Sequence, residues 1–321
     1  MKHHFPTQLS GVFLLSVLIT GVGLTLGGCQ TRQQEVSGEQ VAAPAPENHR
    51  DFQDADGLAS YLHSPPAPLI GAHRGGPAQG FPENATQTFG HALTKGPVLL
   101  ECDVRMTKDS VLVLMHDETL GRTTTGSGPV RGHALKEVRS VQLQTEGGST
   151  TRFEVPTVQE ALAWAEGRAI LELDIKEEVP RSRVVEALRR SDGLDQALVI
   201  TYTLSDARWY HERLPGLVLS VSAETREEAE TLVQQIDPSR LLGWVGVGEM
   251  ASGPAEVFSK NGVPVALGTF GDLDRQARQQ GLSVYHRLFD QGVDIIATDE
   301  TALASQAAAT YNSYSSADAA D

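Results

Sequence analysis

The sequence predicts an α/β protein folded as a TIM (β/α)₈ barrel, with a small β excursion after the second strand. Short apolar runs alternate with amphipathic stretches over residues 67–304, and eight of these runs have the length of a strand. Repeated strand–helix units indicate a parallel sheet, and eight units indicate a closed barrel. The expected strands are Leu69–Ala72, Val98–Val104, Ile170–Ile175, Leu198–Tyr202, Leu217–Val221, Leu241–Val247, Val263–Leu267 and Asp294–Ala297.

Two stretches between the expected strands are typical of helices, Arg181–Arg190 and Glu224–Gln235. The run Val111–Met115 follows the second strand too closely for a helix to lie between them. We therefore assign this run to the β excursion and expect its pairing partner near Pro129–Gly132.

Local signals mark where two helices begin. Thr157 is followed three residues later by Glu160, which is the pattern of a capping box. Glu160 thus has a structural explanation and is not a candidate for chemistry. We expect Asn84 to cap the first helix of the barrel in the same way.

The first 28 residues have the pattern of a bacterial lipoprotein signal peptide. Lys2 precedes an apolar stretch, Val12–Leu26, that is too short and too rich in glycine for a good membrane span. The stretch ends in Leu26-Gly27-Gly28-Cys29, which predicts cleavage before Cys29 and acylation of its thiol. The alternative is ordinary signal-peptide cleavage near Gly28, with Cys29 incidental.

The ends of the mature chain are expected to lie outside the fold. Residues 29–66 would be the acylated cysteine and a flexible tether, whose pattern allows a short helix around Ala55–Leu62. Residues 305–321 are rich in Ala, Ser and Asp, and we expect a disordered tail. The protein would be secreted across the inner membrane and lipid-anchored, at the outer membrane or a periplasmic face. Gln30 rather than Asp after Cys29 favours the outer membrane.

The charge of the chain limits its partners. A net charge of −15 argues against nucleic acid and against docking on anionic lipid. A small anionic substrate remains compatible, because a bound metal ion can invert the local field. Cys102 is the only cysteine besides Cys29, so acylation of Cys29 leaves no intrachain disulfide.

Two expected strands carry alternating charges. Glu101 and Asp103 share one face of the second strand, and Glu172, Asp174 and Lys176 share one face of the third. In a barrel these faces would converge in its mouth, where unpaired carboxylates are costly and should hold a cation or pair with one. The alternative is that they are exposed faces of amphipathic edge strands.

Two histidine clusters favour the interpretation as a site. The first strand runs into His73-Arg74-Gly75-Gly76, and the run Val111–Met115 ends in His116-Asp117. Barrel enzymes place their active sites on such turns, after the carboxyl ends of the strands. The other histidines of the expected barrel are interpreted as structural: His91, His133, His211 and His286.

These motifs, in this order, resemble those of glycerophosphodiester phosphodiesterases. The resemblance rests on His73-Arg74-Gly75, Pro82-Glu83-Asn84, Glu101-x-Asp103, His116-Asp117, Leu120-Gly121-Arg122-Thr123-Thr124, Asp174-x-Lys176 and Ile296-Ala297-Thr298-Asp299. It covers about residues 69–303. It implies a TIM barrel, a divalent metal and hydrolysis of glycerophosphodiesters to glycerol 3-phosphate and an alcohol.

The resemblance also implies the metal ligands. Glu101, Asp103 and Asp174 would bind the metal, and Glu172 is a second-choice ligand on the same face. Many relatives have Glu in place of Asp174, so the shorter side chain here could alter metal distance or preference. An all-oxygen shell suits Ca²⁺ or Mg²⁺ rather than Zn²⁺.

The same resemblance assigns the other roles. His73 and His116 would be the general acid and base, without a decision between them, because the pKa of histidine lies near neutral. Arg74 and Lys176 would hold the phosphate oxygens and stabilise the charge that builds up in the transition state.

The sequence departs from the family pattern at two places that shape the substrate pocket. Phe270 stands where many relatives carry Trp, and Glu300-Thr301 lacks the Pro often found there, which puts substrate specificity in doubt.

Two alternative functions remain. One alternative is a lysophospholipase D or phospholipase-like enzyme with an apolar groove for acyl chains. The other is a non-catalytic surface-binding lipoprotein. Such a protein could lose its ligands, yet the histidines, carboxylates and lysine are all present.

Overall fold

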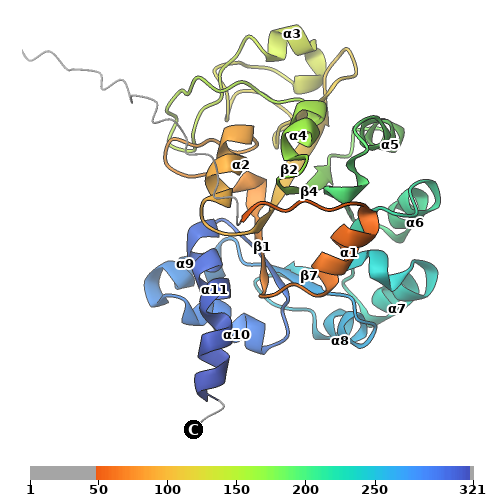
Figure 1. Ribbon diagram of the computed structural model, residues 1–321. Coiled ribbons are helices and arrows are strands. Elements are labelled where there is room, and N and C mark those ends of the chain that lie inside the picture. The colour runs from red at the N-terminus through yellow and green to blue at the C-terminus, as the bar shows by residue number, and fades with distance from the viewer. Residues whose placement is uncertain (1–47, 319–321) are drawn as a thin grey trace, which may run out of the picture. The chain divides into compact units, whose positions relative to one another are not determined.

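Eight parallel strands close into a barrel in the computed structural model, which describes residues 48–318 (Figure 1). Each strand pairs with its neighbours in space, and the pairing of β1 with both β2 and β9 closes the barrel. The eight predicted strands are confirmed, and their ends differ from the predicted ones by at most two residues. The strands are β1 (Leu69–Ala72), β2 (Val98–Met106), β4 (Ile170–Ile175), β5 (Ala197–Thr201), β6 (Val218–Ser222), β7 (Leu241–Val247), β8 (Val265–Gly268) and β9 (Ile295–Thr298).

Helices surround the barrel and alternate with its strands (Figure 1). The predicted helix at Arg181–Arg190 is confirmed, and the one expected at Glu224–Gln235 begins at Arg226 after the N-cap residue Thr225. The helices are α1 (Ala55–His63), α2 (Thr86–Leu93), α3 (Leu135–Val138), α4 (Val158–Ala165), α5 (Arg181–Arg190), α6 (Leu204–Arg213), α7 (Arg226–Gln235), α8 (Ser252–Lys260), α9 (Asp272–Gln280), α10 (Ser283–Asp290) and α11 (Thr301–Asp318).

Helix α1 covers the amino-terminal end of the barrel. Leu58, Ala59 and Leu62 are buried and form one apolar cluster with the deepest inward side chain of each barrel strand. The expected tether through residue 66 is therefore wrong for this stretch, because these side chains gain more by burial than by remaining in solvent. The strand members of the cluster are Leu69, Leu99, Ile170, Leu198, Val218, Leu242, Ala266 and Ile295.

The packing of α1 predicts a measurable loss of stability. Leu62→Ala should lower the free energy of unfolding by about 2–5 kcal/mol, because Leu62 is fully buried. Ser60→Ala, on the exposed side of the same helix, is the control and should change little. Chemical denaturation measures both variants, and wild-type stability in Leu62→Ala would show that α1 is dispensable.

The outward faces of the strands pack against the surrounding helices. Leu100, Cys102 and Val104 of β2 belong to the main apolar core, as do Leu171 and Leu173 of β4. Cys102 is a buried free cysteine. The alternation predicted for these two strands is thus confirmed, and their charged residues face the barrel interior.

The β excursion exists, but its predicted pairing is wrong. β3 (Leu112–Leu114) pairs antiparallel with the extended end of β2, where Val104 lies opposite Leu114. The expected partner, 129–132, instead contains a 3₁₀ turn, η3 (Val130–Gly132). β2 continues to Met106, so its own carboxyl end supplies the pairing edge. A small separate core fills the excursion: Ala85, Val113, Met115, Leu120, Val130, Val138, Leu143 and Val155.

The carboxyl-terminal end of the chain is helical where a disordered tail was expected. Residues 305–318, expected to be disordered, continue helix α11, and Ala304, Ala307 and Ala308 pack into the main core. The signal peptide, Cys29 and the first part of the tether lie outside the described residues, so lipidation stays a prediction. No helix in the range 48–318 has the length and apolarity that a membrane crossing needs.

Candidate active site and metal centre

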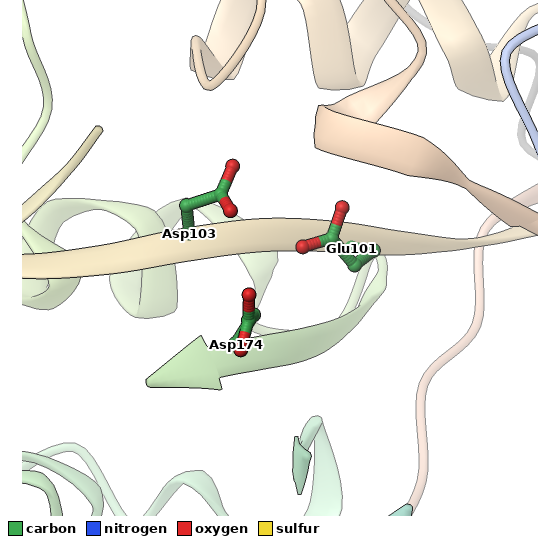
Figure 2. A group of neighbouring side chains, drawn as sticks. All are labelled: Glu101, Asp103 and Asp174. Atoms are coloured by element: carbon green, nitrogen blue, oxygen red, sulfur yellow. The ribbon is translucent and has the colours of Figure 1, made fainter. Parts of the chain in front are cut away.

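Three carboxylates meet at the carboxyl end of β2 and β4. The register pairs Glu101 with Glu172 and Asp103 with Asp174, so all four side chains lie on the inner face. Single oxygens of Glu101, Asp103 and Asp174 lie within 4.8 Å of one another, and all three residues are buried (Figure 2). Glu172 lies one pair deeper in the barrel and is not part of this group. Burial raises the pKa of Glu172 to about 7.

The three carboxylates carry more negative charge than the neighbouring lysine neutralises. Lys176 donates to Oδ1 of Asp103 and to Oδ2 of Asp174, both at 2.5 Å, and among the described residues it is the only side-chain cation bonded to the three carboxylates. Three ionised carboxylates and one ammonium would leave two negative charges in a buried space. Burial, reinforced by the charge of Asp103, raises the pKa of Glu101 well above its usual range. The donor set therefore fits a divalent cation that prefers oxygen ligands.

Asn84 fixes Asp103 from the opposite side. Its Nδ2 donates to Oδ2 of Asp103 at 2.7 Å, and its Oδ1 accepts from the backbone N–H of Asp103 at 2.9 Å. The predicted role of Asn84 as a helix cap is wrong, because Ala85 is the N-cap residue of α2 and makes no side-chain cap. Burial favours the neutral form of Asp103, but Lys176 and Asn84 together hold the pKa of Asp103 below its usual value.

The turn after β1 aims backbone and side-chain donors at this centre. Arg74 has a φ of 53°, in the left-handed region, and its N–H donates to Oε2 of Glu101 at 2.6 Å. Gly75 also has positive φ, and a Cβ there would collide with the ring of Phe89. The Arg74 guanidinium pairs with Glu83 at 3.1 Å, while its Nε is buried without a hydrogen-bond partner. A guanidinium N–H thus remains for a ligand.

His73 is held by a carboxylate on one edge and an aromatic ring on one face. Its Nδ1 lies 2.7 Å from Oδ1 of Asp299, and its ring stacks on Phe270 with centroids 4.7 Å apart. Because a carboxylate only accepts, Nδ1 carries the hydrogen, and Nε2 is the nitrogen left for proton transfer. The Phe270 position, identified as a departure from the family, is therefore in direct contact with a candidate catalytic group.

His116 has a similar partner in a more crowded charge network. Its Nδ1 lies 2.8 Å from Oδ1 of Asp117, and Arg122 donates to both oxygens of the same carboxylate at 2.9 and 2.7 Å. Hydrogen bonds from Arg122 hold the pKa of Asp117 far below its usual value. Arg122 also binds Glu83, the residue that pairs with Arg74. Arg105 donates to the backbone carbonyl of His116 at 2.9 Å.

A cavity of about 1020 Å³ opens beside the centre. Its wall includes Tyr202, whose hydroxyl donates to Oδ1 of Asp174 at 2.9 Å, and Trp244, whose ring stacks on Phe270. The three carboxylates and His73 do not line the cavity themselves, and Tyr202 and Trp244 connect it to the site. Four acidic residues line it, Glu224, Glu227, Glu228 and Glu249.

The structure brings the predicted site residues together at one mouth. Glu101, Asp103, Asp174 and Lys176 are joined as described, and Arg74 contacts Glu101 through its backbone. The sequence analysis assigned no part in the chemistry of the site to the residues that hold them: Glu83, Asn84, Asp117, Arg122, Tyr202 and Asp299. Five of these six lie in the motifs that carried the family resemblance, so that pattern was the available signal. Tyr202 had none.

The fold and the site define a (β/α)₈-barrel enzyme with an acidic centre that can hold a metal and two histidine–carboxylate pairs. Residues 73–303 match the model of the glycerophosphoryl diester phosphodiesterase family, which is more than half of the chain. The chain belongs to this family, and the predicted membership and fold class are confirmed.

Solved structures agree with this membership. A glycerophosphoryl diester phosphodiesterase from Parabacteroides distasonis is 30% identical, with a TM-score of 0.76, over 82% of this chain and 94% of that chain. A phosphodiesterase from Oleispira antarctica, solved with the product sn-glycerol-3-phosphate, shares the fold at 21% identity, with a TM-score of 0.58, over 75% and 96% of the two chains.

Matches to curated proteins are shorter. A glycerophosphodiester phosphodiesterase of Bacillus altitudinis is 30% identical over 163 residues, which is 47% of this chain and 65% of that protein. The uncharacterised protein YqiK of Bacillus subtilis is 33% identical over 140 residues, 41% of this chain and 57% of that protein. The chain thus spans less than two thirds of these relatives.

Proposed function

We propose that the protein hydrolyses glycerophosphodiesters to glycerol 3-phosphate and an alcohol. One observation carries this proposal: three buried carboxylates, two of them bonded to Lys176, lie at the same barrel mouth as the two histidine–carboxylate pairs. Membership of the family supports the same reaction, and the Oleispira relative was solved with the product that the proposal expects.

Glu101, Asp103 and Asp174 would hold Ca²⁺ or Mg²⁺. Support comes from their oxygen donors and from the excess negative charge that Lys176 leaves uncompensated. When bound, such an ion would neutralise charge on the phosphodiester.

The remaining residues bind the phosphate and move protons. Arg74, through its unpartnered Nε–H, and Lys176 would hold the phosphate oxygens and stabilise the developing negative charge. His73 and His116 would act through Nε2, one removing the proton of the attacking oxygen and the other protonating the leaving alkoxide. Their Nδ1 bonds to Asp299 and Asp117 orient both rings for this task.

Soluble diesters suit this site better than lipids. A lysophospholipase D or phospholipase-like enzyme needs an apolar groove for acyl chains. In the described part of the chain, the exposed large hydrophobic side chains are Tyr202 and Val247 alone, and the cavity beside the centre carries four carboxylates. These features favour a small polar alcohol as the leaving group.

Glycerophosphocholine is the substrate with which to test the proposal. A soluble chain starting near Gln53 keeps helix α1 and should release glycerol 3-phosphate and choline with Ca²⁺ or Mg²⁺, and neither product with EDTA. Micelles of lysophosphatidylcholine should be hydrolysed much more slowly. Faster turnover of the micelles would instead favour the lipid enzyme, and a folded protein inactive on both substrates would favour the binding lipoprotein.

A further inference from the structure

A buried carboxylate lies behind the site and belongs to none of the groups assigned above. Asp274 of α9 is 1% exposed and has no ion pair within the described residues. Its Oδ1 accepts from Tyr285 at 2.9 Å and from Thr298 at 2.8 Å. Its Oδ2 accepts from the backbone N–H of Asp299 at 2.8 Å. Burying a carboxylate is expensive, and hydrogen bonds only partly offset the cost.

The third of these bonds connects Asp274 to the candidate catalytic histidine. Asp299 follows β9 directly, and its carboxylate accepts the Nδ1 hydrogen of His73 at 2.7 Å. The Asp299 side chain is 46% exposed, and the bond to Asp274 holds the backbone from which this side chain projects. The arrangement is a chain of hydrogen bonds from Asp274 through Asp299 to His73.

The surroundings keep the Asp299 carboxylate charged. The hydrogen bond from His73 holds the pKa of Asp299 below its usual value, and Arg74 and Arg278 add to this effect. Arg278 is itself paired with Glu300. His73 therefore faces an ionised partner that no arginine binds directly, whereas Asp117, the partner of His116, accepts two hydrogen bonds from Arg122.

We propose that Asp299 is a positioning residue for His73 and that Asp274 holds Asp299 in place for this task. Asp299 fixes the tautomer of His73 with the hydrogen on Nδ1, which leaves Nε2 for the proton transfer. Asp274 contributes through the backbone of Asp299 and touches no reacting atom. The proposal rests on the proposed function only for the catalytic use of His73, because the hydrogen-bond chain itself can be tested without turnover.

The first test measures His73 directly. Nuclear magnetic resonance of the ring nitrogens, with His73 assigned through His73→Gln, gives the tautomer of its neutral ring in wild type and in Asp299→Asn. We expect the Nδ1–H tautomer to dominate in the wild type and to lose its dominance in the variant, because an amide side chain can donate as well as accept. Asp272→Asn, an exposed aspartate on the same helix as Asp274, is the control. An unchanged tautomer in Asp299→Asn would overturn the proposal.

The second test measures the reaction. Asp299→Asn should lower kcat by about 10²-fold or more with little change in KM. Asp299→Glu, which keeps an acceptor-only side chain, should recover part of the loss. Equal losses in Asp299→Asn and Asp299→Glu would contradict the positioning role. If the wild type is inactive on diesters but the tautomer of its His73 depends on Asp299, the proposed function fails and the positioning stands.

The anchoring role of Asp274 has its own readouts. Asp274→Asn should weaken the preference of His73 for the Nδ1–H tautomer, as Asp299→Asn does. Tyr285→Phe removes one of the two bonds to Oδ1 of Asp274 and should leave the tautomer unchanged. If Asp274→Asn does not fold, hydrogen exchange of the Asp299 amide in the wild type decides. We expect strong protection for this amide, and exchange as fast as in a free loop would rule out the anchor.

Discussion

Replacing either His73 or His116 by alanine is expected to lower turnover of glycerophosphocholine by about 10²- to 10⁴-fold, the range typical of lost general acid–base catalysis. Each ring is held through Nδ1 by a carboxylate, His73 by Asp299 and His116 by Asp117, which leaves Nε2 for the proton transfer. Both rings are only partly buried, so the truncation should leave the fold intact. The measurement is kcat with the metal ion at saturation, alongside a thermal melt of each variant.

A third histidine supplies the control for this experiment. His133 lies on the β excursion that also carries His116, and its Nδ1 bonds only the carbonyl of Pro129. His133→Ala should therefore retain wild-type kcat. Near wild-type turnover in His73→Ala or in His116→Ala would remove that residue from the mechanism. An equal loss in His133→Ala would point to a general effect on the fold.

Asp103→Asn and Asp174→Asn are expected to weaken binding of Ca²⁺ or Mg²⁺ by more than about 100-fold, since each removes a direct ligand and outer-shell changes alone cost 10- to 100-fold. Asparagine has the shape of aspartate and keeps one acceptor oxygen, which can still bond Asn84 or Tyr202, while Lys176 loses one of its two acceptors in each variant. The expected result is a protein that melts normally in EDTA and no longer gains stability from the ion. Calorimetric titration of the metal-free protein measures the affinity.

Glu172→Gln is the matched control for the metal ligands. Glu172 is buried on the same face of β4 as Asp174, one pair deeper, and lies outside the group of three carboxylates. The variant should bind the ion with nearly wild-type affinity. A loss as large as that of Asp174→Asn would make Glu172 a ligand. Unchanged affinity in both Asp103→Asn and Asp174→Asn would show that the centre lies elsewhere.

Periodicity predicted the barrel and which charged side chains share a face, and the histidine clusters at the strand ends favoured the inner face. Glu101 and Asp103 alternate with Cys102, and a strand offers only two faces, so one correct assignment decides both. Parallel pairing then places Asp174 beside Asp103, as the register confirms. These features depend on local pattern and on the closure of eight units, and both are visible in the sequence.

Periodic patterns in the sequence do not reveal contacts between segments that are distant along the chain. Asn84 precedes a helix and has the residue type of a cap, but its left-handed backbone turns the side chain toward Asp103 on a neighbouring strand. Helix α1 has its own N-cap, Asp54, yet only the completed barrel offers the apolar end that Leu58 and Leu62 cover. The same holds for α11, whose alanines pack on a core formed by other elements.

The central claim is that the carboxylate group holds a divalent ion that the release of glycerol 3-phosphate requires. The most direct measurement titrates Ca²⁺ or Mg²⁺ into metal-free wild type and Asp103→Asn with glycerophosphocholine present, and follows glycerol 3-phosphate. The account predicts that release by the wild type rises from zero to a plateau with the ion, while the variant stays near zero over the same range. Release that persists in excess EDTA, or equal recovery in the variant, would contradict it.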